Sequence, residues 1–234
     1  MFFDTQYTLY VALPVLALTL LVQLFLKATY AKYSQIGTQR GLTGAETARR
    51  ILDEGGVHGV AVEMVRGFLS DHYDPRHHVL RLSPDNYNGQ SIAAIGVAAH
   101  EAGHALQHAQ AYAPLKLRNM AVPAASIGSS MGYVVLVMGW IMQSFNLAVV
   151  GLGLLLLVLI FELINLPVEF DASRRALQIL PRSGILTVEE NRGAQKVLAA
   201  AALTYVAAMI ATLWTILFWA MRLGLLGGRR HDES

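Results

Sequence analysis

The segment SIAAIGVAAHEAGHALQHAQ, residues 91–110, brings three histidines and one glutamate into a short stretch of an otherwise apolar chain. Ser91 is a typical N-cap residue, and the alanine-rich run after it favours an α-helix. On such a helix His100 and His104 lie one turn apart on the same face, with Glu101 beside them. This is the H-E-x-x-H pattern, in which two imidazoles hold Zn²⁺ and the carboxylate takes a proton from the attacking water. The segment therefore predicts a zinc site with Glu101 as its general base.

The pattern is expected by chance on the order of 0.01 times in a chain of this composition, so it is moderately specific by itself. Small residues surround the histidines, and one of them, Gly103, costs the helix about 1 kcal/mol relative to alanine. That cost indicates that another part of the chain approaches the helix closely at Gly103.

A catalytic zinc usually has three protein ligands and one open position. The chain contains no cysteine, so the third ligand must offer nitrogen or oxygen. One candidate, His108, lies about 6 Å further along the helix axis than His104. We therefore expect it to support the site from outside or to lie at the surface. The other candidates are Glu162, Glu169, Asp171, Glu189 and Glu190.

The segment FELINLPVEFDASRRAL, residues 161–177, is the better source of that ligand. Glu162, Asn165 and Glu169 form one stripe of a helix, which Pro167 is expected to kink. Glu169 would lie where the helix leaves the membrane, and Glu162 deeper, where an ionisable group is costly and usually functional. This placement favours Glu169 as the ligand, leaves Glu162 as the alternative, and makes Asn165 a polar neighbour of the site.

The composition indicates a mainly α integral membrane protein. Hydrophobic residues make up 54% of the 234 residues, charged residues 15%, and the mean hydropathy is +0.44. Four apolar runs are long enough to cross a bilayer, which takes about 20 residues. Only four residues separate the second run from the third, which predicts a tight antiparallel hairpin. The runs cover residues 7–26, 121–142, 147–166 and 197–221.

Basic residues predict the orientation, because lysine and arginine accumulate on the cytoplasmic side. Residues 27–120 carry ten of the eighteen and residues 167–196 carry five, so both segments are expected in the cytoplasm. Arg222, Arg229 and Arg230 oppose this assignment, because a fourth crossing would put two or three of them outside. The expected organisation has five parts. They are a transmembrane anchor (1–26), a cytoplasmic segment with the H-E-x-x-H helix (27–120), a transmembrane hairpin (121–166), a segment with the third ligand (167–196), and a last transmembrane helix with a polar tail (197–234).

The cytoplasmic segment is expected to contain a helix, a small β element, a loop and then the H-E-x-x-H helix. LTGAETARRILDEGG, residues 42–56, has a Thr43 cap and a glycine stop. VAVEMV (60–65) and VLRLS (79–83) have the length of strands, joined through the turn-rich DHYDPRHH (71–78), with His77 and His78 in the turn. SPDNYNGQ (83–90) is expected to be a loop.

Three ordered blocks carry a resemblance to a known family: residues 71–110, NLPVEFDASRRAL (165–177) and VLAAAALTYVAA (197–208). With them the chain resembles the YugP-type neutral zinc metallopeptidases of bacterial membranes. It is more distantly similar to the HtpX-type and CaaX prenyl endopeptidases. The resemblance implies a small α+β zincin-like (gluzincin) metallopeptidase core that contains a short β element.

The resemblance also implies roles for individual residues. Glu169 in EFDAS matches the third ligand of the distant relatives, while Ser173 stands where they have an aspartate that supports a ligand histidine. Asp171 is a candidate substitute for that aspartate. A substrate peptide is expected to lie as an added strand beside a β edge, assigned to Val79, Leu80, Arg81, Leu82 and Ser83.

The predicted activity is that of a zinc endopeptidase in the bacterial inner membrane, with one Zn²⁺ and an active site that faces the cytoplasm. Tyr205 and Arg192 are candidates to stabilise the oxyanion. The substrates are expected to be peptides, membrane proteins or their fragments, and oligomers or membrane partners stay open. A net charge of +2, without basic runs interleaved with aromatics, argues against nucleic acid as a partner.

Two other classes compete with this prediction. A di-iron membrane oxygenase would use His72, His77 and His78 with the later histidines, but it needs further histidine pairs late in the chain, where only His231 follows His108. A non-catalytic membrane scaffold would hold a structural metal. Structural zinc sites are closed by four ligands and often use cysteine, so they fit this chain poorly.

Overall fold

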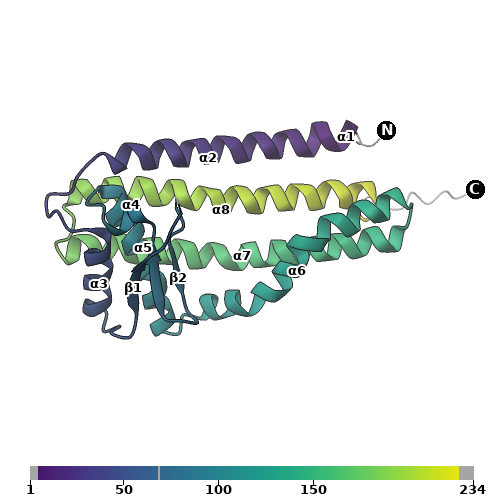
Figure 1. Cartoon of the computed structure of the whole chain (residues 1–234). Coiled ribbons are helices and arrows are strands. Elements are labelled where there is room, and N and C mark those ends of the chain that lie inside the picture. Colours follow the sequence, from purple (N-terminus) through teal and green to yellow (C-terminus); the bar gives the residue numbers. More distant parts are fainter. Residues whose placement is uncertain (1–4, 68, 227–234) are drawn as a thin grey trace, which may run out of the picture. The chain divides into compact units, whose positions relative to one another are not determined.

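The computed structural model describes residues 5–67 and 69–226 and is mainly helical. Helices α2, α6, α7 and α8 are long, and the strands β1, β2 and β3 are short and close together in the sequence (Figure 1). The elements are α1 (Thr5–Tyr7), a π-helical turn (Thr8–Ala12), α2 (Leu13–Ser34), α3 (Gly44–Glu54), β1 (Ala61–Met64), β2 (His72–Asp74), β3 (Val79–Leu82), α4 (Pro84–Tyr87), α5 (Ile92–Ala109), α6 (Ala113–Ile141), α7 (Phe145–Arg182) and α8 (Val188–Arg222).

Four helical stretches in the described part of the chain are long and apolar enough to cross a membrane. They are Thr5–Ser34, Ala113–Ile141, Phe145–Arg182 and Val188–Arg222. Each overlaps one of the four apolar runs, so the described part of the chain has the four candidate spans that the sequence predicts. Helix α7 is longer than its apolar run and continues through Pro167, because the helix beyond that residue is packed in the interior.

The chain forms two compact units. Of the described residues, the membrane unit comprises 5–21, 118–164 and 205–226, and the site unit comprises 22–67, 69–117 and 165–204. In the membrane unit α6 and α7 pack closely through glycines: a Cβ on Gly139 would lie 2.3 Å from the amide nitrogen of Ala148. The turn between these helices is as short as the sequence predicts, since α6 ends at Ile141 and α7 begins at Phe145.

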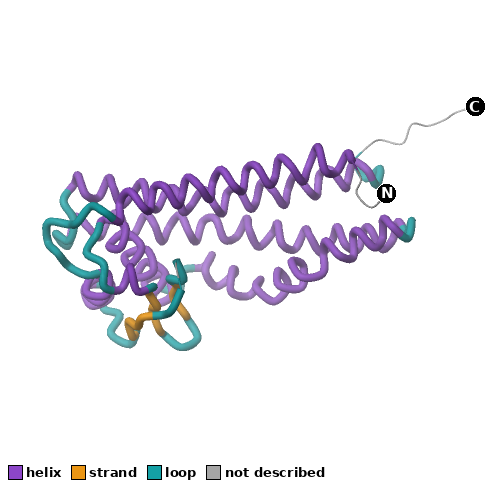
Figure 2. The backbone as a smooth tube through the Cα atoms, turned by 45° about the horizontal axis from the view of Figure 1, so that its top comes forward, coloured by secondary structure: helices purple, strands orange, loops and turns teal. Residues whose placement is uncertain are grey.

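The site unit contains one mixed sheet with the strand order β1-β3-β2. Strand β1 pairs with β3 in parallel and β2 pairs with β3 in antiparallel orientation, so Leu80 faces Val62 on one side and Tyr73 on the other. Figure 2 shows these strands in orange as the small β part of a helical chain.

Three predictions for this region need correction. The segment 71–78 is not only a turn, because its first half forms β2 and only residues 75–78, which include His77 and His78, make the turn. The predicted loop 83–90 contains the short helix α4, which Pro84 begins at its N-terminus. The segment assigned to the substrate is the central strand of the sheet. Both edges of β3 are paired, so Val79, Leu80, Arg81 and Leu82 cannot accept an added strand, and the amide of Ser83 already donates to Asp71. The outer strands of the sheet are β1 and β2.

Helix α5 lies in the centre of the core of the site unit. Its N-terminus is capped by Ser91, whose hydroxyl accepts a hydrogen bond from the amide of Ala94, as predicted. The apolar core around it is fully buried and combines residues from α3, β3 and α5, among them Ile51, Leu52, Leu80, Leu82, Ile95, Ala98 and Ala102. This packing fixes the helix that carries the two histidines.

The predicted cap at Thr43 is confirmed, and it forms a capping box with Glu46 at the N-terminus of α3. The Thr43 hydroxyl accepts from the amide of Glu46 at 3.2 Å, and the Glu46 carboxylate accepts from the amide of Thr43 at 2.8 Å.

We expect Thr43→Ala to lower the free energy of unfolding of the site unit by about 1 kcal/mol, because the cap satisfies an otherwise unpaired amide. The measurement is thermal unfolding in detergent. Thr43→Ser, which keeps the hydroxyl, should unfold close to wild type, and equal losses in both variants would contradict the assignment.

Candidate metal centre

Small residues let α7 and α8 approach the active face of α5 closely. A Cβ on Gly103 would lie 2.7 Å from the carbonyl oxygen of Ala172 in α7. One on Gly96 would lie 3.3 Å from Ala194 in α8. The close approach predicted at Gly103 is therefore confirmed, and the approaching backbone belongs to the segment that carries Glu169.

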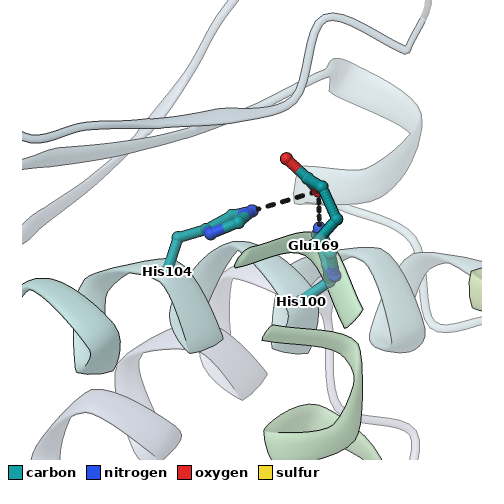
Figure 3. A group of neighbouring side chains, drawn as sticks. All are labelled: His100, His104 and Glu169. Atoms are coloured by element: carbon teal, nitrogen blue, oxygen red, sulfur yellow. Dashed lines mark ion pairs between the residues drawn. The ribbon is translucent and has the colours of Figure 1, made fainter. Parts of the chain in front are cut away.

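His100, His104 and Glu169 converge on one point (Figure 3). The Oε2 atom of Glu169 lies 3.3 Å from Nε2 of His100 and 3.5 Å from Nε2 of His104. Ligand atoms placed 2.0–2.1 Å from a tetrahedral zinc are separated by about 3.3–3.4 Å. The two histidine–carboxylate distances therefore match the edges of a zinc coordination tetrahedron. Among the residues that the structure describes, these three are the group of His, Asp and Glu side chains close enough to share an ion.

The carboxylate of Glu169 is buried with a charge that needs a counterpart. Only 3% of the residue is exposed, and its Oε2 atom accepts no hydrogen bond within the described part of the chain. Burying an uncompensated carboxylate is costly. A cation held between this oxygen and the two Nε2 atoms removes that cost, so the residues present fit a divalent metal ion.

The electrostatics of the site also favour a cation. Burial lowers the pKa of His104, but the neighbouring carboxylates of Glu169 and Glu101 outweigh it, so the net pKa of His104 is raised above its ordinary value. The same negative potential that holds a proton on an imidazole attracts a metal ion in its place. Glu101 belongs to α5 and is itself buried, one residue after the first histidine.

Both imidazoles are hydrogen-bonded through Nδ1, the ring nitrogen that does not face Glu169. Nδ1 of His104 lies 3.0 Å from Oε1 of Gln107, and Nδ1 of His100 lies 3.0 Å from the hydroxyl of Ser173. Gln107 in turn donates to Asp171. The sequence predicted Asp171 as a supporting residue, and the structure brings it to His104 through Gln107. Ser173 keeps a contact with the ligand His100 at the position where the distant relatives have aspartate.

Sequence reasoning missed Gln107 and did not assign a role to Ser173. The spacing of Gln107 from His104, three residues on the same helix, places the two side chains on one face and is a usable signal. Ser173 could have been found from its spacing to Glu169, four residues along α7. Both signals are weak alone, because many pairs in a helix have these spacings.

The structure distinguishes between the two candidate third ligands. Glu169 meets the histidines, whereas Glu162 lies in the membrane unit and accepts a hydrogen bond from Thr212 at 3.0 Å. Asn165 is buried, and its Oδ1 atom makes no hydrogen bond among the described residues. His108 is not part of the ligand group and instead lies 2.8 Å from the hydroxyl of Tyr73 on β2.

The roles of the two oxyanion candidates, Arg192 and Tyr205, stay predictions. Arg192 is exposed and forms an ion pair with Glu189 at 3.4 Å near the start of α8. Tyr205 belongs to the membrane unit, and its role stays a prediction. The other acidic candidate near Arg192, Glu190, is used structurally, since it accepts from the amides of Gln39 and Thr187.

The close contact at Gly103 can be tested by adding a methyl group to this residue. The added methyl group of Gly103→Ala would push α5 away from the backbone of Ala172 and so shift Glu169 relative to the imidazoles. We therefore expect at least a tenfold loss of zinc affinity and a lower thermal stability. Chelator competition and thermal unfolding measure these effects. Gly153→Ala, at a helical glycine with nothing within 4 Å of the added Cβ, is the matched control and should leave both quantities unchanged or gain stability. Unchanged zinc binding in Gly103→Ala would contradict the close-approach argument.

Comparisons with known proteins identify the family of the chain. A family model described as "putative neutral zinc metallopeptidase" matches residues 8–224. A protein of Bacillus subtilis (strain 168), described as "Putative membrane protease YugP", is 45% identical over 228 residues, which cover 97% of this chain and 99% of that protein. No solved structure matches the chain significantly. The match over nearly the whole length shows that the chain belongs to this family of neutral zinc metallopeptidases.

Proposed function

We propose that the protein is a zinc-dependent endopeptidase of the bacterial cell membrane, with His100, His104 and Glu169 as ligands of one Zn²⁺. The observation that carries the proposal is the convergence of these three side chains beside Glu101, at distances that suit a tetrahedral ion. Two histidines on one helix and a glutamate on a second helix form the ligand set of gluzincins, which supports the zincin-like core.

When bound, the zinc ion supplies Lewis acidity, which lowers the pKa of a water molecule and polarises the scissile carbonyl. The chain's own contribution to the chemistry is the carboxylate of Glu101. It accepts the proton of the attacking water and donates it to the nitrogen of the departing amine, so that one carboxylate acts as base and then as acid. Apolar packing holds α5 in the core, and Glu101 on this helix is itself buried.

The substrate class follows from where the site lies in the chain. Residues 165–177 are part of α7, a helix that is long and apolar enough to span a bilayer. This supports membrane proteins or their fragments as substrates, and the distribution of basic residues supports a site on the cytoplasmic side. A bound peptide can add only to an outer strand of the sheet. Strand β2 is the better candidate, because Tyr73 on that strand contacts His108 of the H-E-x-x-H helix.

In the alternative function, a non-catalytic scaffold, the metal would have a structural role. A structural zinc is enclosed by four ligands, whereas the group of described residues offers three and keeps a glutamate beside them. The same three-residue group also lacks the additional ligands that a di-iron centre needs.

Glu101→Gln tests the proposed catalytic role. The amide cannot accept the water proton, so we expect peptidase activity to fall by at least 1000-fold while zinc content stays at one ion per chain. Activity is followed by cleavage of a membrane-protein substrate in detergent or liposomes, and zinc is measured by elemental analysis. A variant that still cleaves at more than a tenth of the wild-type rate would overturn the role of Glu101.

The ligand assignment is tested by a pair of alanine variants on α7. Glu169→Ala removes one of three ligands, and the purified protein should retain less than a tenth of the wild-type zinc. Glu162→Ala removes a carboxylate hydrogen-bonded to Thr212 and should retain all of it. The reverse pattern would assign the third ligand to Glu162 and contradict the proposed site.

A further inference from the structure

We propose that Gln107 is a positioning residue that fixes the tautomer of the neutral His104 imidazole, so that Nδ1 carries the hydrogen and the lone pair of Nε2 faces the metal position. The inference rests on the proposed function, because it deepens the description of the same metal centre. It assigns a role to a side chain that neither binds the ion nor touches the substrate.

Gln107 is fully buried, and its amide group is completely used by three neighbours. Its Nε2 donates to the carbonyl oxygen of Val168 at 2.8 Å and to the carboxylate of Asp171 at 2.9 Å. Its Oε1 faces Nδ1 of His104 at 3.0 Å. The amide therefore links the first helix of the site, α5, to the segment of α7 that carries Glu169.

These partners permit only one orientation of the amide. Val168 offers a carbonyl oxygen and Asp171 a carboxylate oxygen, and both groups can only accept hydrogen bonds. A flipped amide would place its own oxygen against two acceptors within 3 Å. The NH₂ group must therefore face Val168 and Asp171, and the oxygen must face His104.

The orientation of the amide decides the tautomer of the histidine. Because Oε1 of Gln107 can only accept, Nδ1 of His104 must carry the hydrogen. In the neutral imidazole Nε2 then carries the lone pair, and this atom points at Oε2 of Glu169. The side chain that ligates the metal is thus preorganised before the ion arrives.

Asp171 and its arginines hold this arrangement in place. The carboxylate accepts from Arg174 at 2.6 Å and from Arg175 at 2.5 Å in addition to Gln107. Because arginine can only donate, these contacts use both carboxylate oxygens of Asp171 as acceptors. His100 has no equivalent constraint, because the hydroxyl of Ser173 can either donate or accept. The fixed tautomer is a property of the His104 side of the site.

The test uses the full-length protein with three variants. Gln107→Met keeps most of the volume but removes all three hydrogen bonds. Gln178→Met makes the same substitution at an exposed position of α7 and is the matched control. Gln107→Glu keeps an acceptor toward His104 but places two carboxylates, those of residue 107 and Asp171, against each other. The double variant Gln107→Glu with Asp171→Asn replaces the second carboxylate by an amide, which can donate a hydrogen bond to the new glutamate.

Two readouts are used, and only one of them needs zinc. The zinc dissociation constant is measured by competition with a chromophoric chelator. The tautomer of His104 is read from the ring nitrogen chemical shifts of metal-free protein labelled with ¹⁵N-histidine, at a pH where the imidazole is neutral, with His104→Ala to assign the signal.

We expect wild type and Gln178→Met to show the Nδ1–H tautomer and equal zinc affinity. Gln107→Met should lose the fixed tautomer and bind zinc 10–100-fold more weakly. Gln107→Glu with Asp171→Asn should bind at least tenfold more tightly than Gln107→Glu alone. An unchanged tautomer signal and unchanged affinity in Gln107→Met would overturn the role of Gln107. A wild-type protein that binds no zinc would contradict the proposed function instead, and the tautomer signal would still decide the role of Gln107.

Discussion

The buried carboxylate of Glu169 faces the Nε2 atoms of two imidazoles, and this arrangement defines the metal centre. Oxygen and nitrogen lone pairs held within about 3.5 Å of one another repel unless a proton or a metal ion lies between them. Gln107 places the hydrogen of His104 on the far side of the ring, which leaves the lone pair of Nε2 directed into the centre. The site is thus built for a cation, and the surrounding helices supply the framework that keeps the three ligands together.

That framework depends on small residues. Gly103 allows the backbone of α7 to approach α5, and Gly96 and the buried alanines allow α8 to do the same. A helix with larger side chains on this face could carry the same histidines but could not bring Glu169 close enough to share an ion with them. The sequence around the histidines therefore serves the geometry of the site as much as the stability of the helix.

The sequence predicts the elements that depend on local patterns. These include the four apolar helices, the caps at Thr43 and Ser91, and the pair His100 and His104, because each follows from periodicity or spacing within one segment. It did not predict that β3 is the central strand, because strand order depends on the pairing of β1 and β2 with it, and β2 was hidden in a turn-rich segment. It favoured Glu169 over Glu162 without deciding between them, since both lie on one stripe of α7 and only tertiary packing distinguishes them. The role of Gln107 was missed for the same reason.

The most direct test of the metal centre is zinc K-edge X-ray absorption on the purified protein. The structure predicts a four-coordinate shell of light atoms at about 2.0–2.1 Å with the outer scattering of two imidazoles and without sulfur. A protein without bound zinc, or a zinc shell that shows sulfur ligands or no imidazole scattering, would contradict the account.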